Sequence, residues 1–306
     1  MMSYDKNSTA DEVLAGLELH GKTVVITGGH SGLGLESSRA LSKAGARIIV
    51  GARDVVAARK ALSGLSDIEV GQLDLANLNS VREFANAVLF NTKHIDIVIN
   101  SAGIMACPES RVGDGWEAQF AVNHLGHFAL VNHLWPALTG GARVVSVSSA
   151  GHHLSGIRWD DIHFNTGYDK WLAYGQSKTA NVLFAVHLDT LGKEVGVRAF
   201  SLHPGKIITP LQRFLTNDEM VNRGWIDQEG NPADSTFKTP EQGAATQVWA
   251  ATSPLLDGLG GLYCEDCNVA EIEQDAPSQG VRPYAVDPEQ AYRLWELSKK
   301  LTGVSL

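Results

Sequence analysis

The sequence predicts an α/β fold, a single domain built on a doubly wound parallel sheet with helices on both faces. Two observations lead to this fold. Short runs rich in Val and Ile alternate along the chain with longer amphipathic stretches, an order that places parallel strands between crossover helices. The runs are also apolar on successive residues, which is typical of strands buried on both faces.

The expected strands and helices follow one another in a regular order. The strands are expected at 22–27, 46–51, 68–73, 95–100, 142–148 and 197–202, with a last candidate at 260–264. The helices are expected at 33–44, 54–64, 77–91, 114–138 and 175–194. Right-handed crossovers then wind the sheet in both directions from its centre.

The domain organisation follows from the uniform composition. We expect residues 1–20 to form an N-terminal extension and residues 21–306 to form one domain, because the chain does not divide into two compositional halves. Two segments, 150–173 and 206–239, are long and irregular. Such segments in compact domains are often lids or binding loops, and we expect 206–239 to be a substrate loop.

Bulk charge and hydropathy exclude several classes of function. The net charge is -9 and no Lys/Arg cluster occurs, so a nucleic-acid partner is not expected. No apolar run approaches the roughly 18 residues of a membrane span. The first residues lack the basic start and apolar stretch of a signal peptide, so we expect a cytoplasmic protein.

The three cysteines are too few for a disulfide framework in a chain of 306 residues. Cys264 and Cys267 form a C-x-x-C pair, a pattern that can bind zinc or carry redox chemistry. A second ligand pair with zinc spacing is missing nearby. We therefore expect two packed thiols and no metal site.

A glycine-rich turn lies between the first expected strand and the first expected helix. Glycines there let the backbone approach a pyrophosphate, and free amides at the helix N-terminus attract its charge. Glycines also serve plain tight turns, but a turn placed after a strand and before a helix favours a Rossmann-type dinucleotide site. The residues of this turn are Gly28, His30, Ser31, Gly32, Leu33 and Gly34.

The end of the second strand bears on the choice of cofactor. NAD-selective sites place an acid there to bind the ribose 2′-hydroxyl, whereas a nearby Arg accommodates the 2′-phosphate of NADP. This chain has Ala52 at the expected acid position and Arg53 beside it. NADP(H) is favoured, while the following Asp54 keeps NAD(H) open.

A Tyr and a Lys four residues apart form the candidate catalytic pair. Tyr174 and Lys178 share one face of the expected helix. A neighbouring ammonium favours the phenolate, so Lys178 is expected to lower the pKa of Tyr174. A Tyr and a Lys four residues apart also occur on helices without any catalytic role. Tyr168, by contrast, has Leu172 four residues later and no ammonium.

Polar residues at other strand ends complete the candidate site. Ser148 and Ser149 follow a buried strand, at the edge where ligands bind in doubly wound sheets. Residues 100–103 close the preceding strand in the same way. Asn123 lies inside an expected helix, where Asn usually needs a structural or functional reason.

Together these motifs resemble the short-chain dehydrogenase/reductase family over residues 20–210. The turn TGGHSGLG, NSAG, the Asn of AVNHLGHF, VSVSS, YGQSK and the PG of HPGKIIT occur in the family's order. ACPES after NSAG, SSAGHH and the long link before the Tyr resemble the retinol-dehydrogenase-like branch, whose members handle apolar alcohols and aldehydes. Ser101 and Lys206 depart from the usual pattern, and the link from Ser149 to Tyr174 is about twice the common length.

The resemblance implies a role for each matching residue. Tyr174 would be the acid/base, Lys178 would bind the nicotinamide ribose, Ser149 would hold the substrate oxygen and Asn123 would serve a water-linked proton relay. The implied cofactor contacts are Asp74 and Leu75 at the adenine, Asn100, Ala102 and Gly103 at the middle, and Pro204, Gly205, Ile207 and Thr209 at the nicotinamide. The family also implies a homodimer or homotetramer, with 114–138 and 175–194 as the candidate interface.

The sequence therefore predicts an NADP(H)-dependent oxidoreductase that moves a hydride between the nicotinamide and an alcohol or carbonyl carbon of an apolar small molecule. An NAD-preferring enzyme of the same family is one alternative. A nucleotide-sensing binding protein on the same fold is another, because fold alone does not fix function. An isomerase or lyase that uses the cofactor transiently is a third.

Overall fold

The computed structural model describes residues 4–276 and 279–306. Its main sheet has eight strands in the order β10-β9-β8-β7-β4-β1-β2-β3. All neighbouring strands pair in parallel except the antiparallel pair β9 and β10. The strands are β1 (Thr23–Thr27), β2 (Arg47–Ala52), β3 (Ile68–Gln72), β4 (Ile97–Asn100), β7 (Ala142–Val147), β8 (Val197–His203), β9 (Leu262–Glu265) and β10 (Asn268–Val269).

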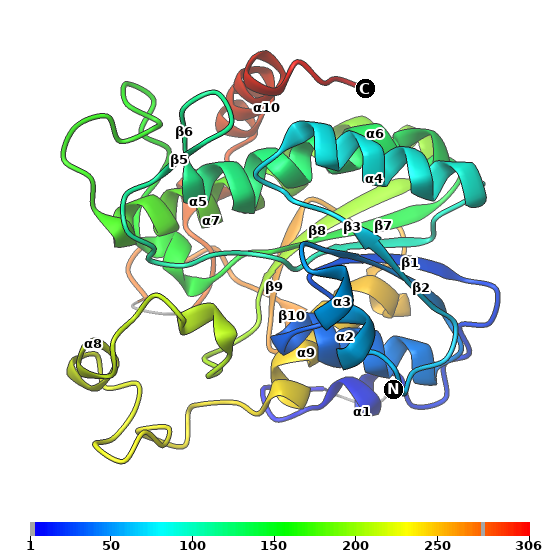
Figure 1. Ribbon diagram of the computed structural model, residues 1–306, viewed down its shortest axis with the longest axis horizontal. Coiled ribbons are helices and arrows are strands. Elements are labelled where there is room, and N and C mark those ends of the chain that lie inside the picture. Colours follow the sequence, from blue (N-terminus) through cyan, green and yellow to red (C-terminus); the bar gives the residue numbers. More distant parts are fainter. Residues whose placement is uncertain (1–3, 277–278) are drawn as a thin grey trace.

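Helices cover both faces of the sheet, which confirms the predicted doubly wound architecture. One layer contains α4 (Leu78–Asn91), α6 (Gly126–Leu138) and α7 (Lys170–Gly192). The other contains α1 (Ala10–Val13), α2 (Gly32–Lys43), α3 (Val55–Ala61) and α9 (Pro240–Thr252). Figure 1 shows the two layers on opposite sides of the strands, with α10 (Pro288–Thr302) outside the first layer and α8 (Asn217–Asn222) projecting from the body.

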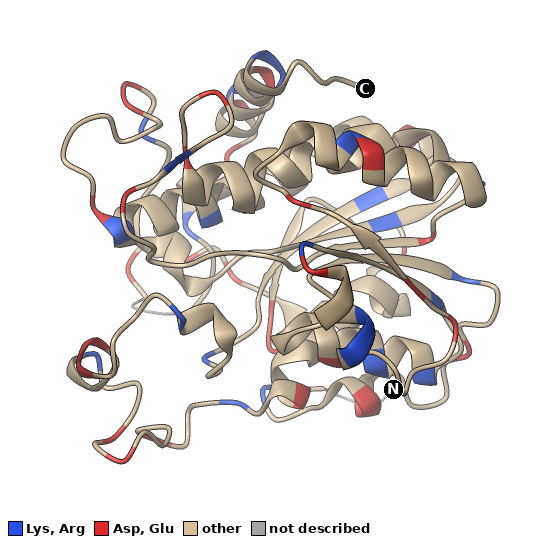
Figure 2. Ribbon diagram, viewed as in Figure 1, with Lys and Arg blue, Asp and Glu red and all other residues tan. Residues whose placement is uncertain are grey.

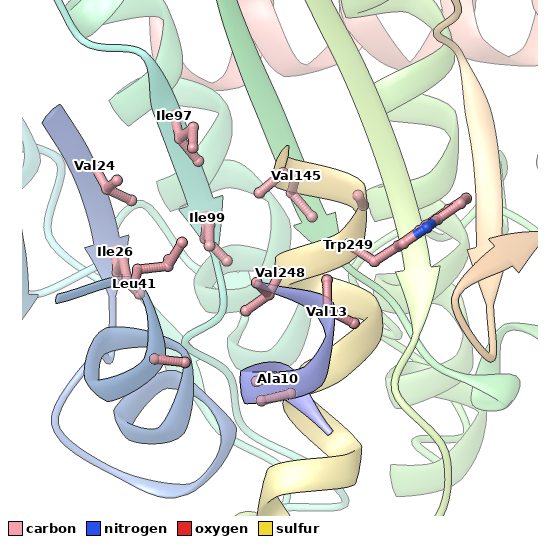
Figure 3. Packing of buried hydrophobic residues seen from close by; sticks show 14 of the residues in the cluster. Ala10, Val13, Val24, Ile26, Leu41, Ile97, Ile99, Val145, Val248 and Trp249 are labelled. Atoms are coloured by element: carbon pink, nitrogen blue, oxygen red, sulfur yellow. The ribbon is translucent and has the colours of Figure 1, made fainter. Parts of the chain in front are cut away.

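Alternate residues of each central strand enter opposite hydrophobic cores. In β1, Val24 and Ile26 face α2 and α9, whereas Val25 faces α4 and α6. Figure 3 shows the first of these cores, in which residues of β1, β4 and β7 pack against Leu41, Val248 and Trp249. Charged residues lie mostly on the helices and loops (Figure 2). Burial on both faces explains why these strands are apolar on successive residues.

The N-terminal residues take part in the same core. Thr9 caps α1, and its hydroxyl accepts from the backbone N–H of Glu12 at 3.3 Å. Ala10 and Val13 are buried (0% and 3% exposed) and belong to the core formed with α2 and α9. Residues 10–14 therefore stabilise the domain by packing on its outer helical layer.

The predicted helix 114–138 is wrong in its first part. Residues 111–117 form a hairpin of β5 (Arg111–Val112) and β6 (Trp116–Glu117), because Gly113 and Gly115 adopt positive φ angles of 54° and 90°, which glycine accepts without strain. The helical part begins at Ala118 with α5 (Ala118–Phe120), continues through a π-helical turn (Ala121–Leu125) and becomes α6.

The helix that carries Tyr174 begins earlier than predicted. α7 starts at Lys170, because the Asp169 side chain caps it by accepting from the backbone N–H groups of Trp171 and Leu172. Tyr174 consequently lies in the second turn of the helix rather than at its opening. The same helix runs to Gly192 and is buried continuously from Ala173 to Ala185.

The helices predicted as an oligomer interface are largely covered within one chain. α4 packs on α6, and α10 packs on α7. Trp295 of α10 lies 4.8 Å from the Phe128 ring and stacks on Phe184 at 5.9 Å between ring centroids.

None of the helices in the described part of the chain has both the length and the hydropathy needed to cross a membrane.

Candidate active site

A cleft of about 1330 Å³ opens at the carboxyl ends of the central strands and gathers nearly all of the predicted site residues. Ligands bind at this edge in doubly wound sheets. Two predicted residues, Asn100 and Asn123, do not line the cleft, because their side chains are buried behind its wall. The predicted residues that line it are Gly28, His30, Ser31, Gly32, Leu33, Gly34, Arg53, Asp74, Leu75, Ala102, Gly103, Ser149, Tyr174, Lys178, Pro204, Gly205, Ile207 and Thr209.

The glycine turn is packed too tightly for side chains at key positions. A Cβ on Gly34 would lie 2.5 Å from the Gly28 carbonyl oxygen, and a Cβ on Gly28 would lie 3.1 Å from Ala102. Gly28 and Gly32 also have positive φ angles of 67° and 51°. The turn therefore presents bare backbone to the cleft, as a pyrophosphate requires.

His30 leaves a polar atom of this turn without a partner. Its Nδ1 is buried and makes no hydrogen bond with the described residues, and burial lowers the pKa of the ring. An unpartnered buried nitrogen is costly unless a ligand satisfies it. The bare backbone and this free nitrogen fit a dinucleotide phosphate group.

A buried hydrogen-bond network fixes the central strand ends relative to one another. The Thr27 hydroxyl oxygen accepts from the backbone N–H groups of Ser101 and Ala102, both at 3.0 Å. It also lies 2.8 Å from His127 Nε2. Since His127 Nδ1 faces the Asn123 carbonyl at 2.9 Å, Nδ1 must donate, and Nε2 accepts the Thr27 proton.

Asn123 sits in the π-helical turn between α5 and α6. Its side chain exchanges two hydrogen bonds of 2.9 Å with the backbone of Ile104 and donates a third to Ser177. π-turns inside helices often occur at functional sites. Here the turn brings Asn123 beside Gly103, where an added Cβ would lie 3.2 Å from its Oδ1 and 3.7 Å from Lys178 Nζ.

Tyr174 and Ser149 meet at the floor of the cleft despite the long link between them. Gly151, near the start of the link, lies against the Tyr174 ring: a Cβ added there would lie only 2.7 Å from the ring. The Gly151 backbone N–H donates to the Ser149 hydroxyl oxygen at 3.0 Å. That bond leaves the Ser149 proton available for Tyr174 or for a bound oxygen atom.

The pKa values of the Tyr–Lys pair are governed by burial. Burial raises the pKa of Tyr174 to about 12, and a hydrogen bond with Ser149 opposes the rise. Burial lowers the pKa of Lys178 to about 8. The expectation that Lys178 lowers the pKa of Tyr174 is not met in this geometry, because the Lys178 ammonium donates to the Val147 carbonyl at 3.0 Å and lies 5.6 Å from the ring centroid of Tyr174.

The part of the cleft at the ends of β2 and β3 contains the residues that bear on cofactor choice. Ala52 is buried, and the Asp54 carboxylate caps α3 by accepting from the backbone N–H of Ala57 at 2.9 Å. Within the described chain, no carboxylate lies at ion-pair distance from the Arg53 guanidinium. Asp74 turns the chain there by accepting from the Ala76 N–H at 3.0 Å.

The segment 206–239 covers the opposite side of the cleft. Its two ends are held together where the Lys238 N–H donates to the Lys206 carbonyl at 2.8 Å. An ion pair of 2.6 Å between Lys238 and Asp266 fixes the same point. α8 and the short 3-10 helix Pro210–Gln212 lie within the segment, so a stretch that looks irregular in the sequence forms a closed loop with local structure.

An apolar wall lies beside Tyr174. Its ring forms a cluster with Met105 and Ala106 after β4 and with Leu215 of the 206–239 segment. The partly buried members of the cluster are Trp171, Leu211, Met220 and Trp225. Two aromatic residues of the 150–173 link, Trp159 and Phe164, do not belong to this wall: Phe164 is fully buried, and Trp159 packs under α10.

Cys264 belongs to β9, and Cys267 lies in the turn between β9 and β10. Burial raises the pKa of Cys264 to about 12 and that of Cys267 to about 11. Both thiols are free and belong to the core under α9. Their environment is that of packed thiols, because reactive cysteines need a lowered pKa.

Sequence reasoning missed four residues that shape the site. Thr27 and His127 fix the strand ends, Gly151 makes room for the Tyr174 ring, and His203 holds the backbone after Ser149 by accepting from the Ala150 N–H at 3.1 Å. Burial lowers the pKa of His203 to about 3, so the ring is neutral.

Comparison with known proteins agrees with the fold. Residues 22–220 match the family described as short chain dehydrogenase. A protein of Streptomyces lividans named "Probable oxidoreductase" is 43% identical over 92% of this chain and 97% of its own. Human retinol dehydrogenase 14 is 36% identical over 94% of this chain and 88% of its own.

Among solved structures, an uncharacterized protein from Mycobacterium paratuberculosis superposes with a TM-score of 0.74, at 33% identity and over 98% of both chains. The glycine turn, the strand-end residues and the Tyr–Lys helix together define an oxidoreductase with an NAD(P)-binding Rossmann fold. The chain belongs to the short-chain dehydrogenase/reductase family.

Proposed function

We propose that the protein is an NADP(H)-dependent oxidoreductase that interconverts an apolar alcohol and its aldehyde or ketone, with Tyr174 as the acid/base. The observation that carries this proposal is the single cleft in which Ser149, Tyr174 and Lys178 face the glycine turn. A binding protein that only senses a nucleotide has no need of an acid/base beside the nicotinamide position.

Each side chain has a defined task in this mechanism. A bound nicotinamide supplies the hydride chemistry, and the protein supplies orientation and electrostatics. In carbonyl reduction, Tyr174 donates its proton to the substrate oxygen while Ser149 hydrogen-bonds that oxygen. The Ser149 hydrogen bond favours the phenolate left on Tyr174, and Lys178 would bind the nicotinamide ribose. In alcohol oxidation, the proton moves the other way.

The preference for NADP(H) is supported by the adenine end of the cleft. Arg53 has no ion-pair partner within the described chain and lines the cleft, whereas the Asp54 carboxylate is engaged in capping α3. A carboxylate in that role is poorly placed to bind a ribose 2′-hydroxyl, which is how NAD-selective sites use an acid.

The apolar substrate is supported by the wall around Tyr174. Met105, Trp171, Leu211 and Trp225 offer apolar and aromatic surface to a ligand, and ligand pockets lined in this way hold apolar bodies with few polar anchors. Relatives named retinol dehydrogenase agree with a long apolar alcohol or aldehyde as the substrate class.

A panel of aldehydes and ketones with NADPH, followed by absorbance, tests the proposal. We expect Tyr174→Phe to remove turnover, with a loss of at least about a hundredfold, while NADPH affinity stays within a fewfold. Tyr292→Phe, on the exposed side of α10, is the matched control. Wild-type rates in Tyr174→Phe, or no NADPH consumption with any carbonyl compound, would contradict the assignment.

A further inference from the structure

Two arginine side chains from distant parts of the sequence face the same cleft without an acidic partner. Arg53 follows β2, and Arg213 follows the short 3-10 helix Pro210–Gln212 in the 206–239 segment. Within the described chain, neither guanidinium has a carboxylate within ion-pair distance. Unpaired cations that line a cleft are a favourable place for an anion.

The chain before Arg213 is seated directly on the glycine turn. A Cβ added to Gly32 would lie 3.5 Å from Thr209 Cβ and 3.9 Å from Pro210 Cδ. A capping box holds this part in shape, since the Thr209 N–H donates to the Gln212 side chain at 2.9 Å. Arg213 therefore projects from a fixed support next to the predicted phosphate-binding turn.

Local contacts hold the Arg213 side chain but leave most of its donors free. Its Nη1 donates to the Pro210 carbonyl at 3.1 Å. The guanidinium also lies 4.9 Å from the ring centroid of Phe214. An Arg has five N–H donors in a planar fork that suits phosphate oxygens, so a positioned Arg213 retains the geometry needed for a phosphate.

Arg53 and Arg213 are close enough to repel one another. Partial burial lowers the pKa of Arg213, and the charge of Arg53 lowers it further. A dianionic phosphate between the two side chains would relieve this repulsion and pair with both.

We propose that Arg213 binds the 2′-phosphate of NADP(H) together with Arg53, so that the 206–239 segment closes on the phosphate that distinguishes the two nicotinamide cofactors. The proposal rests on the proposed function and deepens it. Leu211 and Leu215, on either side of Arg213, belong to the apolar wall with Tyr174. Phosphate binding at Arg213 therefore also orders the wall that receives the substrate.

Binding of two small nucleotides tests the proposal without turnover. Calorimetry compares 2′,5′-ADP, which carries the 2′-phosphate, with 5′-AMP, which lacks it. We expect Arg213→Met to weaken 2′,5′-ADP about tenfold, the scale of one charge-assisted hydrogen bond, and to leave 5′-AMP unchanged. Arg213→Lys should recover part of the loss, because it restores the charge without the fork.

Arg223→Met is the matched control from the same segment. Arg223 is also exposed, but it stacks on Trp171 at 3.6 Å, on the substrate side of the cleft. We expect the Arg223→Met variant to bind both nucleotides as tightly as the wild type does. Equal thermal unfolding temperatures of the wild type and of each variant, measured without nucleotide, would show that folding is intact.

The possible outcomes separate the two proposals. If Arg53→Met weakens 2′,5′-ADP while Arg213→Met does not, the role of Arg213 is wrong and the NADP(H) preference stands. If Arg213→Met weakens the binding of both nucleotides equally, Arg213 does not contact the 2′-phosphate specifically. If the wild-type protein does not prefer 2′,5′-ADP, the NADP(H) preference itself is wrong, and the role of Arg213 falls with it.

Discussion

The cofactor side of the cleft and the 206–239 segment that faces it are built in different ways. On the cofactor side, Thr27, Asn123 and His127 are at most 2% exposed and are joined by directional hydrogen bonds. In the segment, α8 has no buried residue. It is attached through the Arg223 guanidinium on the Trp171 ring and an ion pair between Lys170 and Glu219.

This difference follows from what each side has to do. Hydride and proton transfer require reacting groups that are held within a fraction of an ångström, and a buried hydrogen-bond network supplies that constraint. A wall for an apolar ligand needs surface and some freedom to open. The segment supplies both, because few buried contacts hold it and local opening is correspondingly cheap.

The strongest test of the constrained side is the room around the Tyr174 ring. Gly151→Ala places a methyl group 2.7 Å from the ring. A displacement of about 1 Å costs on the order of a hundredfold in rate, so we expect kcat to fall by about that factor. At Gly156, where an added Cβ would meet Tyr284 at an ordinary 3.7 Å, Gly156→Ala should leave kcat nearly unchanged. Equal kcat values in the two variants would show that the ring is not confined.

The next test removes the hydroxyl that joins the central strand ends. Thr27→Val leaves two backbone N–H groups and His127 without their partner. Unsatisfied buried groups cost about 1–3 kcal/mol each before relaxation, so we expect about 2 kcal/mol less stability toward urea. Thr23 lies on the same strand, and its hydroxyl makes no hydrogen bond with the described residues, so Thr23→Val should change stability by no more than about 0.5 kcal/mol. Similar losses in both variants would contradict a special role for Thr27.

The pH profile of carbonyl reduction should report Lys178. Because burial lowers its pKa to about 8, the ammonium is present below that pH and is lost above it. Tyr174, with a pKa raised to about 12, stays protonated over this range. We therefore expect kcat/KM to be level below pH 8 and to fall about tenfold per pH unit above it. A profile that is flat from pH 7 to 10 would rule out a role for the charged form.

The smallest effect is expected where α7 contacts the 206–239 segment. Lys170→Met breaks the ion pair with Glu219, and both side chains of this pair are partly exposed. Such pairs contribute about 0.2–1 kcal/mol, so KM for an apolar aldehyde should rise by no more than about fivefold with kcat unchanged. Lys193→Met, just beyond the other end of α7, is the control. A hundredfold loss of kcat in Lys170→Met would mean that the segment is as constrained as the cofactor side.

The sequence allowed the constrained side to be predicted in detail. Buried parallel strands have a periodicity that is visible in one sequence, and their ends fix which residues share an edge. Arg53 and Ser149 were located in this way, and the structure places both on one cleft. The helix spacing of Tyr174 and Lys178 put them on one face even though the start of α7 was misplaced by several residues.

The remaining features depend on contacts that are not local in sequence. The orientation of His127 follows from its contact with Thr27, a hundred positions away along the chain. The hairpin at 111–117 was mistaken for helix because its apolar residues pack by tertiary contact, although Gly113 and Gly115 were a usable turn signal. The pKa of Tyr174 was expected to be lowered, because spacing reveals a neighbouring Lys but not the depth of burial.

The π-helical turn has a consequence for how the chain tolerates insertions and deletions. Asn123 is tied to the backbone of Ile104 on one side. Three residues later, Gly126 lies so close to the Leu75 carbonyl that a Cβ would come within 2.4 Å. Deleting one residue between them would restore a regular helix but rotate one of the two by about 100°. The irregular turn thus sets a fixed count between two anchored positions, and an alignment of relatives that opens a gap there would separate groups that the structure holds in register.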